Sequence, residues 1–242
     1  MFRRTACIAV SAPVASTDWP PGDKRPSRVS ATRLAVIDAN RVKAELIRCF
    51  FAHRAGLDVV ALEHTGRAGI AAVAQTKPEL VLAALTPPDI AMGDFVSRLR
   101  AAAPAARLIL LTSQCNEYLV HTLSAADYHG LVWEAEEGLA SLGQLIDRVR
   151  NGARVVSPGI LRVQATLRLA PNAFPKLLSA RHQEVLACIA HSMSDKEIAR
   201  KMGFSVGTAL SHRQKIMQKL NIHTTPKLIQ FCIKKGFCEI AS

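Results

Sequence analysis

The feature that most constrains this fold is a regular alternation of short apolar runs with longer stretches of helical periodicity, from residue 33 to residue 151. The apolar runs, which we expect to form strands, are 34–38, 57–62, 80–85, 108–112 and 130–134. The stretches that we expect to form helices are 42–53, 68–75, 93–102, 117–124 and 139–151. Alternation of this kind is typical of a parallel sheet whose strands are connected by crossover helices.

The number of strand–helix units further limits the folds that this part of the chain can adopt. Five units in succession predict an α/β flavodoxin-like domain with a five-stranded parallel sheet over residues 32–155. In such a sheet the carboxyl ends of the strands meet along one edge, so functional side chains are expected there.

The positive charge of the chain is concentrated at its carboxyl end. Of a formal net charge of +12, residues 1–31 carry +3, residues 32–155 carry none and residues 156–242 carry +9. A basic segment on an otherwise neutral chain indicates a polyanion as partner, either nucleic acid or an anionic membrane surface. The charge distribution alone does not distinguish nucleic acid from a membrane surface as the partner.

The cysteine pattern and the length of the uncharged runs exclude several classes of protein. Six cysteines are scattered without a Cys-x-x-Cys pair, so we expect neither a zinc site nor a disulfide framework, and a reducing, cytoplasmic location fits better. No uncharged run in the body of the chain is long enough to cross a bilayer, the apolar run at 80–88 included. We therefore expect a soluble protein without a membrane-spanning segment.

The first 31 residues are predicted to be a flexible leader. They hold four of the twelve prolines and show no sustained periodicity. Arg3 and Arg4 before a mildly apolar run faintly resemble a signal peptide, but Ser11 and Pro13 interrupt that run. We expect no export.

Residues at the predicted strand ends resemble a known family. Asp38 ends the first strand, Thr112 ends the fourth, and the third is flanked by Pro78 and Pro88. With the closing stretch 148–158, this arrangement resembles the receiver domain of bacterial two-component response regulators over residues 32–158. The resemblance implies a Mg²⁺ site at an acidic pair, a phospho-accepting aspartate, a switch hydroxyl and a lysine.

Most of these implied groups are replaced here, so the receiver is predicted to be degenerate. The corresponding positions are occupied by Asp38 and Ala39 for the acidic pair, Ala84 for the acceptor, Thr112 for the hydroxyl and Trp133 for the lysine. Ala84 has no carboxylate that could form an acyl phosphate. We therefore expect no aspartyl phosphorylation, no bound metal and no cofactor. Trp133 is expected to fill the vacated pocket or to pack against the neighbouring sheet edge.

After a predicted linker at 156–177, the segment 178–242 shows the spacing of four short helices. Ser194 and Glu197 form a capping box that opens the second helix, Gly203 ends it, and Ser205 caps a third helix that extends to about residue 220. A short helix, a tight turn and a longer helix with a polar outer face are typical of a helix-turn-helix. Thr225 is then expected to cap a fourth helix, 226–235, which has Pro226 in its first turn and ends at Gly236.

Three segments, Leu-Ser-Ala-Arg-His-Gln-Glu-Val-Leu at 178–186, Ser-Asp-Lys-Glu-Ile-Ala at 194–199 and the whole of 205–220, closely resemble the LuxR/FixJ-type DNA-binding domain. The resemblance identifies the polyanion as double-stranded DNA and implies that the third helix enters the major groove. The positions expected to face bases are Leu210, Ser211 and Gln214, and the candidate phosphate contacts are Thr208, Arg213, Lys215 and Lys219. For Leu210, a contact to the first helix of the domain is the alternative.

The combined interpretation is a sequence-specific transcription regulator of response-regulator layout, not an enzyme, which acts on the transcription machinery without control by aspartyl phosphate. The family resemblance implies a homodimer whose contacts come from Leu228, Phe231 and Cys232 on the fourth helix. One alternative is an acyl-homoserine-lactone receptor of similar length. The other is a signalling module that works mainly through receiver-mediated protein contacts or heterodimers.

Overall fold

The computed structural model describes residues 31–52 and 56–238. The expected leader 1–31 therefore lies almost wholly outside the described residues. Within the described part, no helix is both long enough and apolar enough to cross a membrane.

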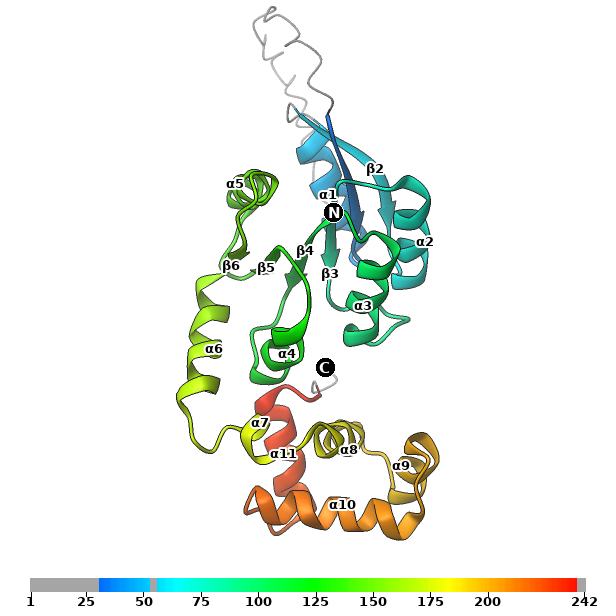
Figure 1. The fold of residues 1–242 in the computed structure, drawn as a ribbon, viewed down its shortest axis with the longest axis vertical. Coiled ribbons are helices and arrows are strands. Elements are labelled where there is room, and N and C mark those ends of the chain that lie inside the picture. The colour runs from blue at the N-terminus through cyan, green and yellow to red at the C-terminus, as the bar shows by residue number, and fades with distance from the viewer. Residues whose placement is uncertain (1–30, 53–55, 239–242) are drawn as a thin grey trace, which may run out of the picture. The chain divides into compact units, whose positions relative to one another are not determined.

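A parallel sheet with helices on both faces forms the first domain (Figure 1). Its strands follow the order β2-β1-β3-β4-β5-β6. The strands are β1 (Thr32–Ile37), β2 (Leu57–Glu63), β3 (Leu80–Ala84), β4 (Arg107–Thr112), β5 (Gly130–Trp133) and β6 (Val155–Val156). The helices are α1 (Arg41–Ala52), α2 (Gly66–Thr76), α3 (Met92–Ala102), α4 (Glu117–Thr122) with the 3-10 turn η1 (Leu123–Ala125), and α5 (Leu139–Arg150).

The strands are apolar throughout because both faces of the sheet are covered. In β1, Leu34 and Val36 pack beneath α1 and α5, whereas Ala35 and Ile37 pack with α2, α3 and α4. Both cores are fully buried. A continuous apolar strand is what a doubly covered parallel sheet requires, so the flavodoxin-like prediction is confirmed.

The prediction of five strands was one too few, because β6 extends the sheet beyond β5. Val155 N–H donates to the His129 carbonyl and Ser157 N–H donates to the Leu131 carbonyl, at 2.9 and 3.0 Å. A two-residue strand is too short to produce an alternation signal. It lies at the boundary that the sequence analysis assigned between domain and linker.

The expected linker is largely helical. It contains α6 (Pro158–Leu169) and the short α7 (Phe174–Leu177). α6 contributes Ile160 to the core that also contains Leu119 and Val120 of α4. Gly159 lets this helix approach β5, since a Cβ there would lie 2.5 Å from the Trp133 ring. α6 is thus a packed part of the first domain.

The second domain consists of α8 (Ala180–Ala190), α9 (Asp195–Met202), α10 (Val206–Lys219) and α11 (Thr225–Lys235) (Figure 1). Its core contains apolar residues of all four helices, among them Val185, Ile198, Ile216 and Leu228. The fourth helix starts one residue earlier than expected, because Thr224 rather than Thr225 is the N-cap.

Candidate nucleic-acid interface and receiver pocket

Local hydrogen bonds fix the geometry of the helix-turn-helix. The Ser194 hydroxyl accepts from Glu197 N–H, and the Glu197 carboxylate accepts from Ser194 N–H at 2.7 Å, which is the predicted capping box. Gly203 ends α9 in the left-handed region, with a φ of 70°. Ser205 then caps α10 by accepting from Thr208 N–H at 3.1 Å.

Two side-chain contacts orient α10. The Arg213 guanidinium donates to the Asp195 carboxylate on α9 through both Nε and Nη2, each at 2.8 Å. The His212 ring stacks on Phe204 with centroids 4.9 Å apart. These contacts join the first turn of α9, the inter-helix turn and the middle of α10 into one unit.

The face of α10 opposite its buried Ala209 and Ile216 is open to solvent. Leu210 is 45% exposed and Gln214 is exposed, while Ser211 is partly buried. Val206 is 48% exposed and lies four residues before Leu210, on the same face. Val206 was not among the residues predicted to face DNA, although its spacing from Leu210 and Gln214 was a usable signal. Leu210 is too exposed to be a core contact to α8.

The residues expected to contact phosphates differ in their exposure and in the hydrogen bonds that their side chains already make. Lys215 is exposed, and Lys219 Nζ donates to the Leu177 carbonyl at 3.1 Å. The Thr208 hydroxyl shares a 2.8 Å hydrogen bond with Ser205 Oγ in the cap of α10. Arg213 is only 14% exposed and is held by Asp195. Its geometry favours positioning of α10 over phosphate contact.

The expected dimer contacts on α11 require a correction. Leu228 and Cys232 have no exposed surface and belong to the core of the second domain. Phe231 is partly buried against the same core. Burial also raises the pKa of the Cys232 thiol to about 12. Leu228 and Cys232 face inward because the apolar stripe of α11 is the one that closes the four-helix core.

Asp38, the acidic residue of the expected metal-binding pair, is held by a lysine from α1. Asp38 follows β1 and is 3% exposed. Lys43 Nζ lies 2.8 Å from Asp38 Oδ2 and 2.5 Å from Glu134 Oε1. Burial opposes the charge of Lys43, but the hydrogen bonds that its ammonium group donates to Asp38 and Glu134, together with the attraction of their charges, outweigh burial and raise the lysine pKa. An internal ammonium group therefore bridges the two carboxylates.

This arrangement does not fit the Mg²⁺ site that the family resemblance implies. Mg²⁺ requires oxygen ligands in octahedral geometry, whereas Lys43 occupies the oxygen of Asp38 that would be one of them. Ala39 and Ala84 provide no oxygen in their side chains. The described residues contain no group of three or more His, Cys, Asp or Glu side chains that could hold a metal ion.

Of the two interpretations of Trp133, its contacts favour packing against neighbouring structure over filling the vacated pocket. Its indole packs against Gly159 of α6 and donates from Nε1 to the Ser113 carbonyl at 3.3 Å. The next residue, Glu134, is the one that reaches Lys43. Successive residues of a strand point to opposite faces, so Glu134 faces Lys43 and Trp133 does not.

Thr112 lies where the switch hydroxyl was expected, but its side chain is engaged locally. Thr112 Oγ1 donates to the Gln114 carbonyl at 2.8 Å and accepts from Gln114 N–H at 3.1 Å. The residue is 2% exposed. The hydroxyl thus closes the turn that follows β4.

Known protein families and known proteins are similar to parts of this chain. Residues 176–232 match the family "Bacterial regulatory proteins, luxR family". The transcriptional regulatory protein MctR of Rhizobium johnstonii is 28% identical over 185 residues, which are 72% of this chain and 84% of MctR. The oxygen regulatory protein NreC of Staphylococcus epidermidis is 26% identical and covers 86% of this chain and 99% of NreC.

Solved structures show the same fold at lower identity. A structure of the RcsB response regulator of Salmonella typhimurium has a TM-score of 0.60 at 18% identity, and covers 83% of this chain and 96% of its own. A complex of the response regulator RcsB with DNA has a TM-score of 0.56 at 19% identity, and covers 84% of this chain and 98% of its own.

Proposed function

We propose that the chain is a sequence-specific transcription regulator whose receiver is not switched by aspartyl phosphate, because it joins a receiver-like domain to a helix-turn-helix domain that matches the luxR family and is similar to the transcriptional regulatory protein MctR and the oxygen regulatory protein NreC. The Lys43 bridge between Asp38 and Glu134 is the observation that carries the second part of this proposal. It supplies permanently the positive charge that a metal ion would supply transiently.

Sequence recognition rests on the exposed face of α10. Val206, Leu210 and Gln214 recur every four residues along it, which suits a helix lying in the major groove. Gln214 has the donor and acceptor needed to pair with adenine, and Leu210 is suited to a thymine methyl group. The similarity to the transcriptional regulatory protein MctR and to RcsB, which was solved in complex with DNA, supports this use of the domain.

The acyl-homoserine-lactone alternative has no support in the fold. The first domain is a parallel sheet whose neighbours are response regulators, with cores filled on both faces. The second alternative, a module acting mainly through protein contacts or heterodimers, is an outcome of the experiment below.

The protein is further proposed to act as a homodimer, but through the receiver instead of α11. Val42 and Leu46 on α1 are 71% and 54% exposed, and Leu139 at the start of α5 is 38% exposed. Leu46 and Leu139 line one common hollow of about 290 Å³. An apolar face of this kind on a soluble domain marks an interaction surface, and a second copy places two helix-turn-helix units on two half-sites.

Selection from a random DNA library tests the function. The purified chain should enrich a motif with two half-sites, and acetyl phosphate with Mg²⁺ should leave both the motif and the intact mass unchanged. A species heavier by one phosphoryl group would contradict the proposed lack of phosphorylation. Failure to enrich any motif would instead favour the module that acts through protein contacts.

Two variants of α10 should distinguish a residue that contacts bases from a residue that contacts phosphates. Gln214→Ala should weaken binding to the selected motif by about 1 to 3 kcal/mol and relax the preference at one base pair. Lys215→Ala should weaken binding to all sequences alike and reduce the salt dependence of affinity by about one counterion. Binding titrations at several salt concentrations on the motif and on a scrambled duplex measure both. A uniform effect from both variants would contradict the assignment.

A further inference from the structure

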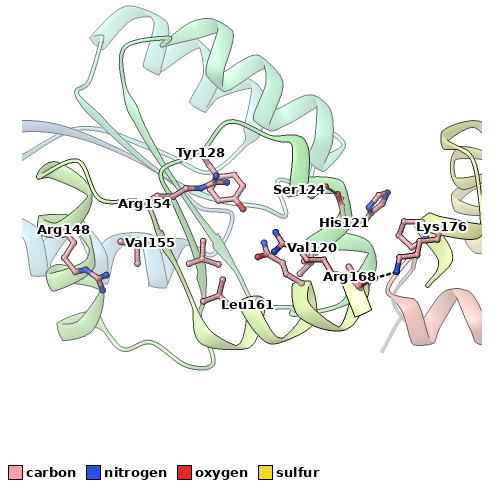
Figure 2. Close-up of a pocket in the computed structure, with 14 residues that line it drawn as sticks. Val120, His121, Ser124, Tyr128, Arg148, Arg154, Val155, Leu161, Arg168 and Lys176 are labelled. Atoms are coloured by element: carbon pink, nitrogen blue, oxygen red, sulfur yellow. Dashed lines mark hydrogen bonds between the residues drawn. The ribbon is translucent and has the colours of Figure 1, made fainter. Parts of the chain in front are cut away.

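A cavity in the first domain is not used by the proposed function. It has a volume of about 730 Å³ and is shown in Figure 2. Its walls come from α4, the end of α5, β6 and α6, with the start of α7 at one end. The cavity therefore lies apart from Asp38 and Lys43 and from the exposed face of α10.

The charged residues that line this cavity are all basic. They are Arg148, Arg154, Arg168 and Lys176, with His121 as a further nitrogen donor. No carboxylate lines the cavity, and none of the ion pairs among the described residues includes Arg148, Arg154 or Arg168. In a segment whose net charge over 32–155 is zero, this concentration of unpaired guanidinium groups produces a local positive potential. Such a potential favours an anionic ligand.

The guanidinium groups are spread over the cavity. Figure 2 shows Arg148 and Arg168 towards opposite ends, with Arg154 between them. Lys176 closes one end, where its Nζ donates to the carbonyls of Arg168 and Ala170 at 2.6 and 2.8 Å. Planar guanidinium groups bind phosphate oxygens in pairs. Separated arginines suit an extended ligand with several phosphate groups better than a single small anion.

One of the arginines also offers a stacking surface. The Arg154 guanidinium carbon lies over the Tyr128 ring, 4.6 Å from its centroid, and Tyr128 is 4% exposed. A buried aromatic ring beneath a guanidinium holds that group in place, and guanidinium groups themselves stack on planar rings. Val120, Val155 and Leu161 provide apolar surface beside it. These features suit a planar, partly apolar group.

We propose that this cavity is a binding site for a nucleotide that carries several phosphate groups. The base stacks at Arg154 and the apolar wall, and the phosphates contact Arg148 and Arg168. The volume lies in the range of ligand sites in proteins, about 300 to 1,000 Å³. Because the site contacts α4, α6 and α7 together, its occupation restrains the segment that leads to the DNA-binding domain.

Calorimetric titration of the full chain tests the site in the absence of DNA, so its outcome is independent of the proposed DNA-binding function. The probes are ATP and GTP, with adenosine and pyrophosphate as partial ligands. At least one nucleotide should bind, and adenosine and pyrophosphate should each bind roughly tenfold or more weakly, since each lacks one half of the interactions. Binding of neither nucleotide at millimolar concentration would overturn the proposal.

Variants of exposed arginines test whether the nucleotide binds in this cavity. The double variant Arg154→Gln, Arg168→Gln should lose roughly tenfold or more in nucleotide affinity. The matched control Arg98→Gln removes one exposed arginine on α3, outside the cavity, and should leave affinity unchanged. Equal losses in both would show that binding is non-specific and would overturn the site. Unchanged nucleotide affinity in the double variant, with weaker binding to an unrelated DNA duplex, would overturn it in favour of a DNA contact.

Discussion

Lys43→Ala should lower the free energy of unfolding by about 2 to 4 kcal/mol, because it leaves the Asp38 carboxylate buried without its cation. The Lys43 side chain is 31% exposed, so we expect less than the loss for a fully buried pair. Chemical denaturation followed by circular dichroism measures the effect. Adding Asp38→Asn to Lys43→Ala should recover more than half of it, since the double variant buries no unpaired charge.

The same variant tests whether the lysine takes the place of a metal ion. In Lys43→Ala, Asp38 and Glu134 face a space without a cation, so 10 mM Mg²⁺, roughly the concentration needed for a weak two-carboxylate site, should raise its melting temperature. The parent chain should show no such rise. An equal response of the two proteins to Mg²⁺ would contradict the assigned role of Lys43.

The contribution of Lys43 to stability should depend on pH in the alkaline range. Its pKa is raised above the ordinary value of 10.5 in the folded chain. The folded state therefore holds the proton more tightly, so the contribution is fully present below pH 10.5 and is lost as the pH rises through the folded pKa. The difference in free energy of unfolding between the parent and Lys43→Ala should be constant near neutral pH. It should shrink as the pH rises above 10.5.

How far the sequence predicted the fold and the site depends on the length of each pattern. The long periodic segments identified the doubly covered sheet and the helix-turn-helix, because the apolar runs of β1 to β5 and the caps at Ser194 and Ser205 are strong local signals. β6 and α7 have two and four residues and give no such signal.

The receiver pocket shows a different limit. Lys43 lies on α1, 91 residues before its partner Glu134, and nothing local to either residue indicates the ion pair. The sequence assigned the lysine position to Trp133, whereas Glu134, the next residue, reaches Lys43, because neighbouring residues at a strand end point to opposite faces. For α11 the dimer contacts were implied by the family resemblance, and a resemblance does not say which apolar side chains of the helix face their own core and which face a second subunit.

The second large effect is expected at Leu228, whose burial places it in the core of the second domain and not on a dimer surface. Leu228→Ala should lower the free energy of unfolding by about 2 to 5 kcal/mol, because Leu228 is fully buried among the four helices and its truncation leaves a cavity. It should leave self-association through the receiver unchanged under conditions where the variant is folded. Chemical denaturation and sedimentation velocity measure the two quantities on the same full-length samples.

Leu46→Asp should have the opposite pair of effects. Leu46 is 54% exposed on α1, so a charge there should change the stability of the monomer by only about 0.5 kcal/mol while it disrupts an apolar contact between receivers. Leu169→Asp is the matched control, since Leu169 is 81% exposed at the end of α6, outside the proposed surface. A dimer that dissociates in Leu228→Ala without loss of stability, and persists in Leu46→Asp, would return the interface to α11.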